Sequence, residues 1–86
     1  MKIKRNIAIS DSGFIFNPSS GDSFSTNPIG LEILRMLKDD KEKEAIKKHV
    51  LHTYQTDEAT FEKDYYDFVN MLIKMNVTEE DEKEKN

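Results

Sequence analysis

The chain has 86 residues, no cysteine, a formal net charge of −4, and charged side chains at 35% of its positions. A chain of this length forms one domain with a small core, which leaves no room for a deep catalytic cavity. The lack of cysteine excludes disulfides, thiolate metal ligands and a thiol nucleophile, and the acidic balance disfavours a nucleic-acid partner. No apolar run approaches the ~18 residues that span a bilayer, so we expect a cytoplasmic protein with no membrane association.

Three strands are predicted before the first helix. Apolar residues recur along Ile3–Ser10, and the turn residues Asp11-Ser12-Gly13 join this segment to a second strand, Phe14–Asn17. The turn formers of Pro18–Gly21 then lead to Asp22–Thr26, where polar and apolar residues alternate as in a half-exposed strand. Because this third strand is short and polar, we expect it at an edge of the sheet.

The first helix is predicted to begin at Pro28, with Asn27 as its N-cap, and to end near Lys38. Its apolar stripe is Ile29, Ile33, Leu34 and Leu37. Gly30 lowers the helix propensity within this stripe. Its presence predicts that another element approaches the helix closely at that point.

Two more helices follow. The second is expected over about Glu42–Thr53, and its inward face is expected to be Ala45, Ile46, His49 and Val50. The third is expected from an N-cap at Thr56 or Asp57 to about Met75.

The third helix carries two apolar rows. The first row is Phe61, Tyr65, Phe68, Leu72 and Met75, and the second row is Tyr66, Val69 and Ile73. The two rows could be adjacent parts of one buried stripe. Alternatively, the first row is core and the second is partly open and lines a groove. The residues alone leave both interpretations standing.

Catalytic and metal-binding patterns are weak. His49 and His52 are three residues apart on a predicted helix, but a metal site needs further ligands. No serine lies in a nucleophile elbow, and no glycine-rich phosphate loop is present. We therefore expect no enzymatic activity, metal or cofactor. The segment Thr78–Asn86 has no apolar residue and is predicted to be a frayed helix end or a charged, disordered tail after a domain of residues 1–77.

Several segments in this order resemble the PqqD family of small peptide chaperones, part of the leader-peptide recognition elements of ribosomally made, modified peptides. The matching pieces are Gly13–Asn17, Gly21–Ser23 with Phe24, Asn27–Gly30, the helix end Leu34–Leu37, Ile46, Tyr54, Asp64, Phe68 and Leu72. The resemblance spans about Arg5 to Val77. Asn76 stands where the family pattern has glycine, and asparagine also tolerates the left-handed conformation.

The resemblance implies an α+β fold of the winged helix-turn-helix type, with a three-stranded antiparallel sheet followed by three helices. It further implies a leader peptide that adds a strand at the sheet edge and packs on the last helix. A maturation enzyme, such as one of the radical S-adenosylmethionine class, would then receive the peptide. On this interpretation the second row lines the groove, and the peptide-binding residues are Asp22, Ser23, Phe24, Ser25, Thr26, Glu62, Tyr66, Val69 and Ile73.

Two alternatives remain at this point. A winged-helix DNA-binding protein would need a basic recognition helix, whereas the lysines of the second and third helices are offset by acidic residues. A structural subunit of an enzyme complex could use the same exposed row without binding peptide. The edge strand could also pair weakly with a second copy of the chain.

Overall fold

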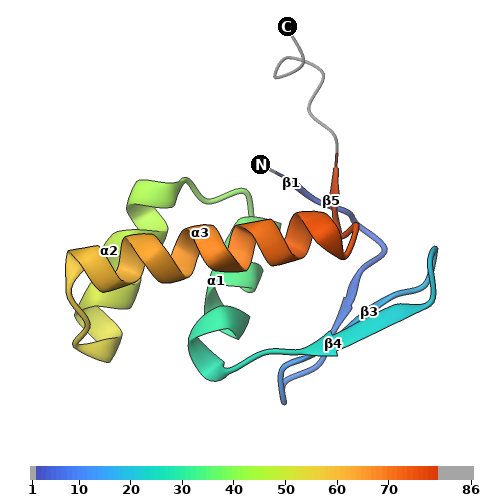
Figure 1. Ribbon diagram of the computed structural model, residues 1–86, viewed down its shortest axis with the longest axis horizontal. Helices are drawn as coiled ribbons and strands as arrows, with labels where there is room; N and C mark the ends of the chain where they lie inside the picture. The colour runs from blue at the N-terminus through green and yellow to red at the C-terminus, as the bar shows by residue number, and fades with distance from the viewer. Residues whose placement is uncertain (1, 80–86) are drawn as a thin grey trace, which may run out of the picture.

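The computed structural model describes residues 2–79 (Figure 1). Strands β2, β3 and β4 form a three-stranded antiparallel sheet, and three helices follow it, so the expected α+β fold is confirmed. The elements of this unit are β2 (Ala8–Ile9), β3 (Phe14–Asn17), β4 (Asp22–Ser25), α1 (Pro28–Lys38), α2 (Lys43–Tyr54) and α3 (Glu58–Lys74). Figure 1 shows α3 running along the molecule, with α2 beside its N-terminal half and the sheet beside its C-terminal half.

The sheet has one buried and one exposed face. Ile15 and Asn17 are buried, whereas Phe14 and Phe16 point to the exposed face, as strand alternation requires. The strand order is β2-β3-β4, with Phe14 opposite Ser25 and Asn17 opposite Asp22. Within residues 2–79, β4 therefore has one paired edge and one open edge, as the short polar third strand predicted.

The first predicted strand is wrong in its middle. Instead of one strand over Ile3–Ser10, the chain turns between Lys4 and Ile7 and separates β1 (Lys2–Ile3) from β2. Ile3 and Ile7 are both buried. A continuous strand would have placed Arg5 on the same face as these two isoleucines, and the turn leaves Arg5 exposed.

The helix starts follow the predicted capping residues. The side chain of Asn27 accepts a hydrogen bond from the Gly30 N–H, and that of Asp57 accepts one from the Thr60 N–H. Beyond α3, Asn76 has a φ of 61°, the left-handed conformation expected there.

The helices meet over one hydrophobic core, to which each contributes a stripe. The buried helical residues are Gly30, Ile33, Leu34 and Leu37 from α1, Ile46 and Val50 from α2, and Phe61, Tyr65, Val69 and Leu72 from α3. The inward face predicted for α2 was too wide, because Ala45 and His49 are exposed. The buried residues of α2 are Ile46 and Val50, and Leu51 and Tyr54 are partly buried against the same core.

The two ends of the described chain are paired. Thr78 and Glu79 form β5, which lies antiparallel to β1 with Lys2 opposite Glu79. Residues 78 and 79 therefore belong to the folded unit and not to the tail expected there. The rest of that predicted tail, residues 80–86, lies outside the described residues. Among residues 2–79, no helix combines the length and hydrophobicity that a membrane-crossing segment needs.

Candidate functional site

Among the described residues 2–79, no strand pairs with the outer edge of β4, which therefore presents free backbone groups. The Thr26 N–H donates to the Gly13 carbonyl at 2.8 Å, and the Ser10 N–H donates to the Phe14 carbonyl at 2.9 Å. Hydrogen-bonded and non-hydrogen-bonded pairs alternate along an antiparallel ladder. Ser23 and Ser25 therefore occupy non-hydrogen-bonded positions relative to β3. Their N–H and C=O groups point away from the sheet, where a further strand could bond to them.

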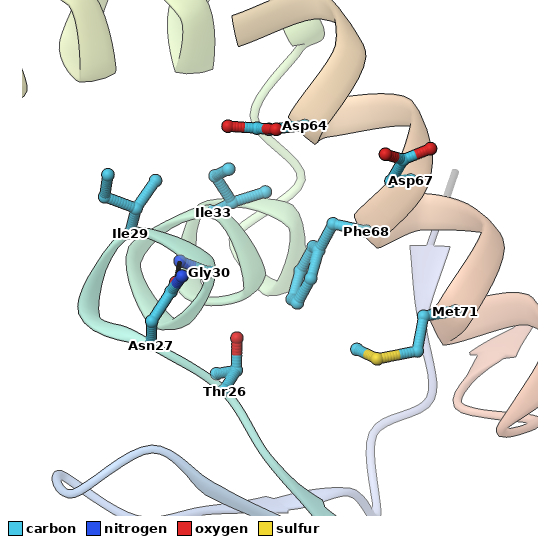
Figure 2. A pocket seen from close by; sticks show the side chains of 9 residues that line it. All are labelled: Thr26, Asn27, Ile29, Gly30, Ile33, Asp64, Asp67, Phe68 and Met71. Atoms are coloured by element: carbon cyan, nitrogen blue, oxygen red, sulfur yellow. Dashed lines mark hydrogen bonds between the residues drawn. The ribbon is translucent and has the colours of Figure 1, made fainter. Parts of the chain in front are cut away.

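A pocket of about 330 Å³ lies next to this edge, between the start of α1 and one side of α3. Figure 2 shows its lining side chains, with Phe68 and Met71 pointing from α3 toward α1. The nine residues that line it are Thr26, Asn27, Ile29, Gly30, Ile33, Asp64, Asp67, Phe68 and Met71. A peptide strand paired with the open edge of β4 would therefore lie beside a pocket with apolar walls.

Gly30 makes this pocket geometrically possible. A Cβ at this position would lie 2.0 Å from the Thr26 Oγ1 and 3.1 Å from a ring carbon of Phe68. The chain leaving β4 and the side chain of Phe68 thus both come against the backbone of α1. The close approach that glycine predicted within this helix is confirmed.

Two carboxylates stand at the α3 side of the pocket. Asp64 and Asp67 are both exposed, and Asp67 pairs with Lys63 across an N–O distance of 3.2 Å. None of the nine lining residues is basic. At the α1 side, the Asn27 Oδ1 accepts the Gly30 N–H, so the positive end of that helix already has a partner. The pocket is therefore apolar inside and negatively charged on one side.

The five predicted binding residues on and after β4 lie together at the open edge. Ser23 and Ser25 contribute backbone groups, and their side chains share the outer face with Phe14 and Phe16. Phe24 is half-buried on the inner face, opposite Ile15. Thr26 lines the pocket, while Asp22 is exposed at the other end of the strand. Whether these residues bind peptide stays a prediction.

The α3 residues predicted for the same groove lie elsewhere, and this placement is a correction. Tyr66 is about 160° from Phe68 around the helix axis, at ~100° per residue, so it points away from the pocket. Ile73 borders a hollow formed with Lys4 and Thr78, near the paired chain ends. Tyr66 and Ile73 are each 53% exposed, but on the flank of α3 that faces away from β4.

The remaining member of the second row is also misplaced. Val69 is 9% exposed and belongs to the core. Conversely, Phe68 was assigned to the core row and is only half-buried, because it lines the pocket. The groove side of α3 is thus the Asp64, Phe68 and Met71 side. The sequence did contain a signal for the position of the groove. Gly30 marks the side of α1 that another element approaches closely, and that element includes Phe68 of α3.

Glu62, the last predicted binding residue, holds α2 against α3. Its carboxylate lies 2.6 Å from the Lys43 ammonium, and this hydrogen bond lowers the pKa of Glu62. Lys43 also donates to the Tyr66 hydroxyl at 2.9 Å and lies 4.4 Å from the Tyr66 ring centroid. Lys47 pairs with Glu58 at 3.1 Å. These lysines neutralise acids of the protein itself, so they make a poor phosphate-binding surface.

A second polar cluster joins α1 to α2. The Glu32 carboxylate accepts a hydrogen bond from the Tyr54 hydroxyl and is paired with His49. Both contacts lower the pKa of Glu32 from its ordinary 4.5, and the hydrogen bond from Tyr54 has the larger effect. Within residues 2–79, no group of three or more potential metal ligands comes together. His49, one of the two histidines considered for metal binding, is hydrogen-bonded to Glu32 between the helices.

Comparison with known proteins now adds to this geometry. The sequence profile of the family described as "Coenzyme PQQ synthesis protein D (PqqD)" matches residues 13–77, which include the sheet, the pocket and all three helices. The chain belongs to the PqqD family. A search of curated protein sequences finds no match. Among solved structures, this PqqD-family chain is similar to "TbiB1 in Complex with the TbiA(beta) Leader Peptide". The TM-score is 0.80 at 27% identity, over 92% of this chain and 95% of that one.

Proposed function

We propose that this PqqD-family protein is a non-catalytic peptide chaperone. It binds the leader segment of a ribosomally made precursor peptide at β4 and presents that peptide to a maturation enzyme. The observation that carries the proposal is the open β4 edge beside the pocket. Similarity to a protein whose structure was solved with a leader peptide supports it.

The binding mechanism is strand addition. An extended peptide beside β4 would exchange hydrogen bonds with the outward N–H and C=O groups of Ser23 and Ser25. Its side chains would alternate between the two faces of the extended sheet. Those on the face of Phe24 would lie over the pocket, and those on the other face would lie beside Phe14 and Phe16. The backbone ladder supplies affinity, and the pocket selects among side chains.

The pocket also supports a role without catalysis. Of the nine described residues that line it, Asp64 and Asp67 are the ionisable ones, and both are exposed. Acid–base catalysis by two carboxylates needs a different environment around each of them, whereas both of these carboxylates face solvent. The chemistry of peptide modification therefore belongs to a partner enzyme. We place that enzyme in the radical S-adenosylmethionine class, and the complex in the cytoplasm where precursor peptides are synthesised.

A proline at the open edge tests strand addition. Ser23→Pro removes an outward N–H that has no partner in β3, so the domain should stay folded. It should nevertheless weaken binding of a fluorescently labelled peptide that binds the parent protein by at least about tenfold, which equals ~1.4 kcal/mol. Fluorescence anisotropy measures the affinity, and a thermal melt checks the fold.

Ser23→Ala is the matched control for this experiment. It keeps the backbone donor and changes only a side chain on the outer face, so its affinity should match that of the parent. A folded Ser23→Pro variant that binds like the parent would show that the peptide does not pair with β4.

A further inference from the structure

We infer that the peptide segment bound here carries an apolar and a cationic side chain two residues apart. The apolar side chain enters the pocket between Phe68 and Ile29, and the cation, lysine or arginine, meets Asp64 and Asp67. This inference rests on the proposed function and names the kind of peptide that the site selects. It follows from the walls of the pocket, its charge, and the spacing of side chains along a strand.

The apolar requirement comes from the pocket walls. Ile29, Phe68 and Met71 are half-buried hydrophobic residues that also pack against the core. Ile33 lies behind them and is 2% exposed. Covering these residues with an apolar side chain removes hydrocarbon surface from water, which favours binding. A polar side chain placed against Ile29, Phe68 and Met71 would lose water contacts and meet only carbon and sulfur atoms of these side chains.

The cationic requirement comes from the charge beside these walls. Figure 2 shows the Asp64 carboxylate extending from α3 toward α1, above Ile33, with Asp67 one turn further along α3. The lining residues include these two acids and no base. Asp67 does pair with Lys63, but both side chains are more than two-thirds exposed. Such a pair is weak enough to exchange one partner for another.

The spacing of the two peptide side chains follows from strand geometry. Residues i and i+2 of a strand point to the same face and lie ~6.7 Å apart, at 3.3–3.4 Å per residue. Asp64 and Phe68 are four residues apart on α3, which is ~6 Å along the helix axis at 1.5 Å per residue. Asp67 and Met71 have the same separation. A peptide strand lying along α3 can therefore place the side chain of its residue i on the apolar walls. The side chain of its residue i+2 then lies beside Asp64 and Asp67.

A display selection tests this inference without knowledge of the natural precursor. The probe is a library of random 12-residue peptides, selected separately against the parent protein, the Asp64→Asn/Asp67→Asn variant and the Ser23→Pro variant. Both aspartates are exposed, so their replacement by asparagine keeps the size of the side chains and should leave the fold intact. Thermal melts of all three proteins confirm that folding is equal.

The parent should enrich peptides with leucine, isoleucine, methionine or phenylalanine two positions from lysine or arginine. The asparagine variant should keep the apolar preference and lose the cationic one. For a selected peptide, changing its lysine to norleucine should weaken binding to the parent about threefold to tenfold. The same change of lysine to norleucine should have little effect on the affinity for the asparagine variant. A double-mutant cycle gives this result if the peptide lysine and the two aspartates interact.

The outcomes separate the two proposals. The charge inference would be overturned if the selected peptides need an intact β4 edge but show no cationic preference. It would also be overturned if they bind the asparagine variant and the parent equally well. Either result would leave the proposed function standing. Peptides that bind Ser23→Pro as well as the parent would overturn strand addition itself. Failure of the parent to enrich any peptide would overturn both.

Discussion

Gly30 is the residue on which the shape of the pocket depends most directly. It lies in the first turn of α1, where alanine would favour the helix by up to ~1 kcal/mol. The Thr26 hydroxyl and the Phe68 ring instead occupy the space that a Cβ would need. Glycine at this position makes α1 less stable than alanine would. It also allows the chain after β4 and the pocket side of α3 to approach α1 closely.

Gly30→Ala should therefore destabilise the domain despite its better helix propensity. The new methyl group would overlap the Thr26 Oγ1 at 2.0 Å, and such overpacking costs about 1–3 kcal/mol. Thermal or urea unfolding measures the loss. The double variant Thr26→Ala/Gly30→Ala removes the clashing hydroxyl and should recover most of the stability. If the single variant is more stable than the parent, the packing at this position is looser than the structure shows.

Individual residues also show where sequence reasoning reaches its limit. The capping role of Asn27, the close approach at Gly30 and the left-handed Asn76 were all predictable, because each depends on local backbone chemistry. The placement of Tyr66 was not. Helical spacing tells which residues share a side of α3, but it does not tell which neighbouring element covers that side. Tyr66 is exposed, as expected, yet it packs with Lys43 of α2 and not with a groove.

At the scale of elements, α3 has three working sides. One is buried against the core, one lines the pocket beside β4, and one carries Glu62 and Tyr66, which contact Lys43 of α2. The second apolar row crosses two of these sides, since Val69 is buried and Ile73 is exposed. Substitutions in that one row should therefore have different effects.

Val69→Asp should destabilise the domain by about 3 kcal/mol or more, because it places a carboxylate in the hydrophobic core. Ile73→Asp is the matched control in the same row. It should change stability by only about 0.5 kcal/mol, since the side chain is mostly in water, and peptide binding should be unaffected because Ile73 is remote from the pocket. Urea unfolding of both variants checks the difference. Equal stability of the two would mean that Val69 is not part of the core.

The contact between α1 and α2 should make stability depend on pH. Hydrogen bonds from Tyr54 and His49 lower the pKa of Glu32 below its ordinary 4.5. The contribution of Glu32 is therefore fully present above pH 4.5 and is lost as the pH falls through its lowered pKa. Since Glu32 is about one-third exposed, the contribution should be no more than about 1 kcal/mol.

Glu32→Gln tests this dependence. The parent should be more stable than the variant at pH 7, and the two unfolding free energies should converge in acid. In alkali the same contact should weaken, because hydrogen bonding to Glu32 raises the pKa of Tyr54 and ionisation of Tyr54 removes the donor. Urea unfolding over a pH series provides the measurement. A constant difference between the two proteins across the acid range would contradict the assignment.

Most elements were predictable from their own residues, and the errors arise where an element depends on a distant partner. The turn residues and helix caps located β3, β4 and all three helices to within about one residue. The break between β1 and β2 was missed because β1 pairs with β5, from the other end of the described chain. No local pattern in Thr78 and Glu79 identifies them as a strand.

At the scale of the whole molecule, Asn17 connects the sheet to the end of α3. It is 1% exposed, and its Nδ2 donates to the Asn76 carbonyl at 2.9 Å while its Oδ1 accepts the Ser19 N–H at 3.0 Å. The two bonds fix the turn after β3 and the left-handed residue after α3 relative to each other. This side chain therefore helps to hold the sheet against the end of α3.

Asn17→Ala should cost about 1–3 kcal/mol, because it removes two part-buried hydrogen bonds, each with a net contribution of ~0.5–1.5 kcal/mol. Asn6→Ala is the control, since it removes an exposed hydrogen bond to Ser19 at the same turn and should cost less than about 1 kcal/mol. Urea unfolding provides both values. Similar losses for the two variants would show that the part-buried bonds do not help to hold the sheet against the end of α3.

The pairing of β1 with β5 has a consequence for the order of folding. It joins Lys2 to Glu79 through two-residue strands, so nearly the whole described chain forms the loop that must close. Closing a longer loop costs more entropy, and contacts between distant residues form slowly. The sheet β2-β3-β4 and the α2–α3 pair are local by comparison. We expect the ends to join last during refolding, and the Lys4 amide, bonded to the Val77 carbonyl, to exchange its hydrogen with solvent sooner than the amides in the middle of α3.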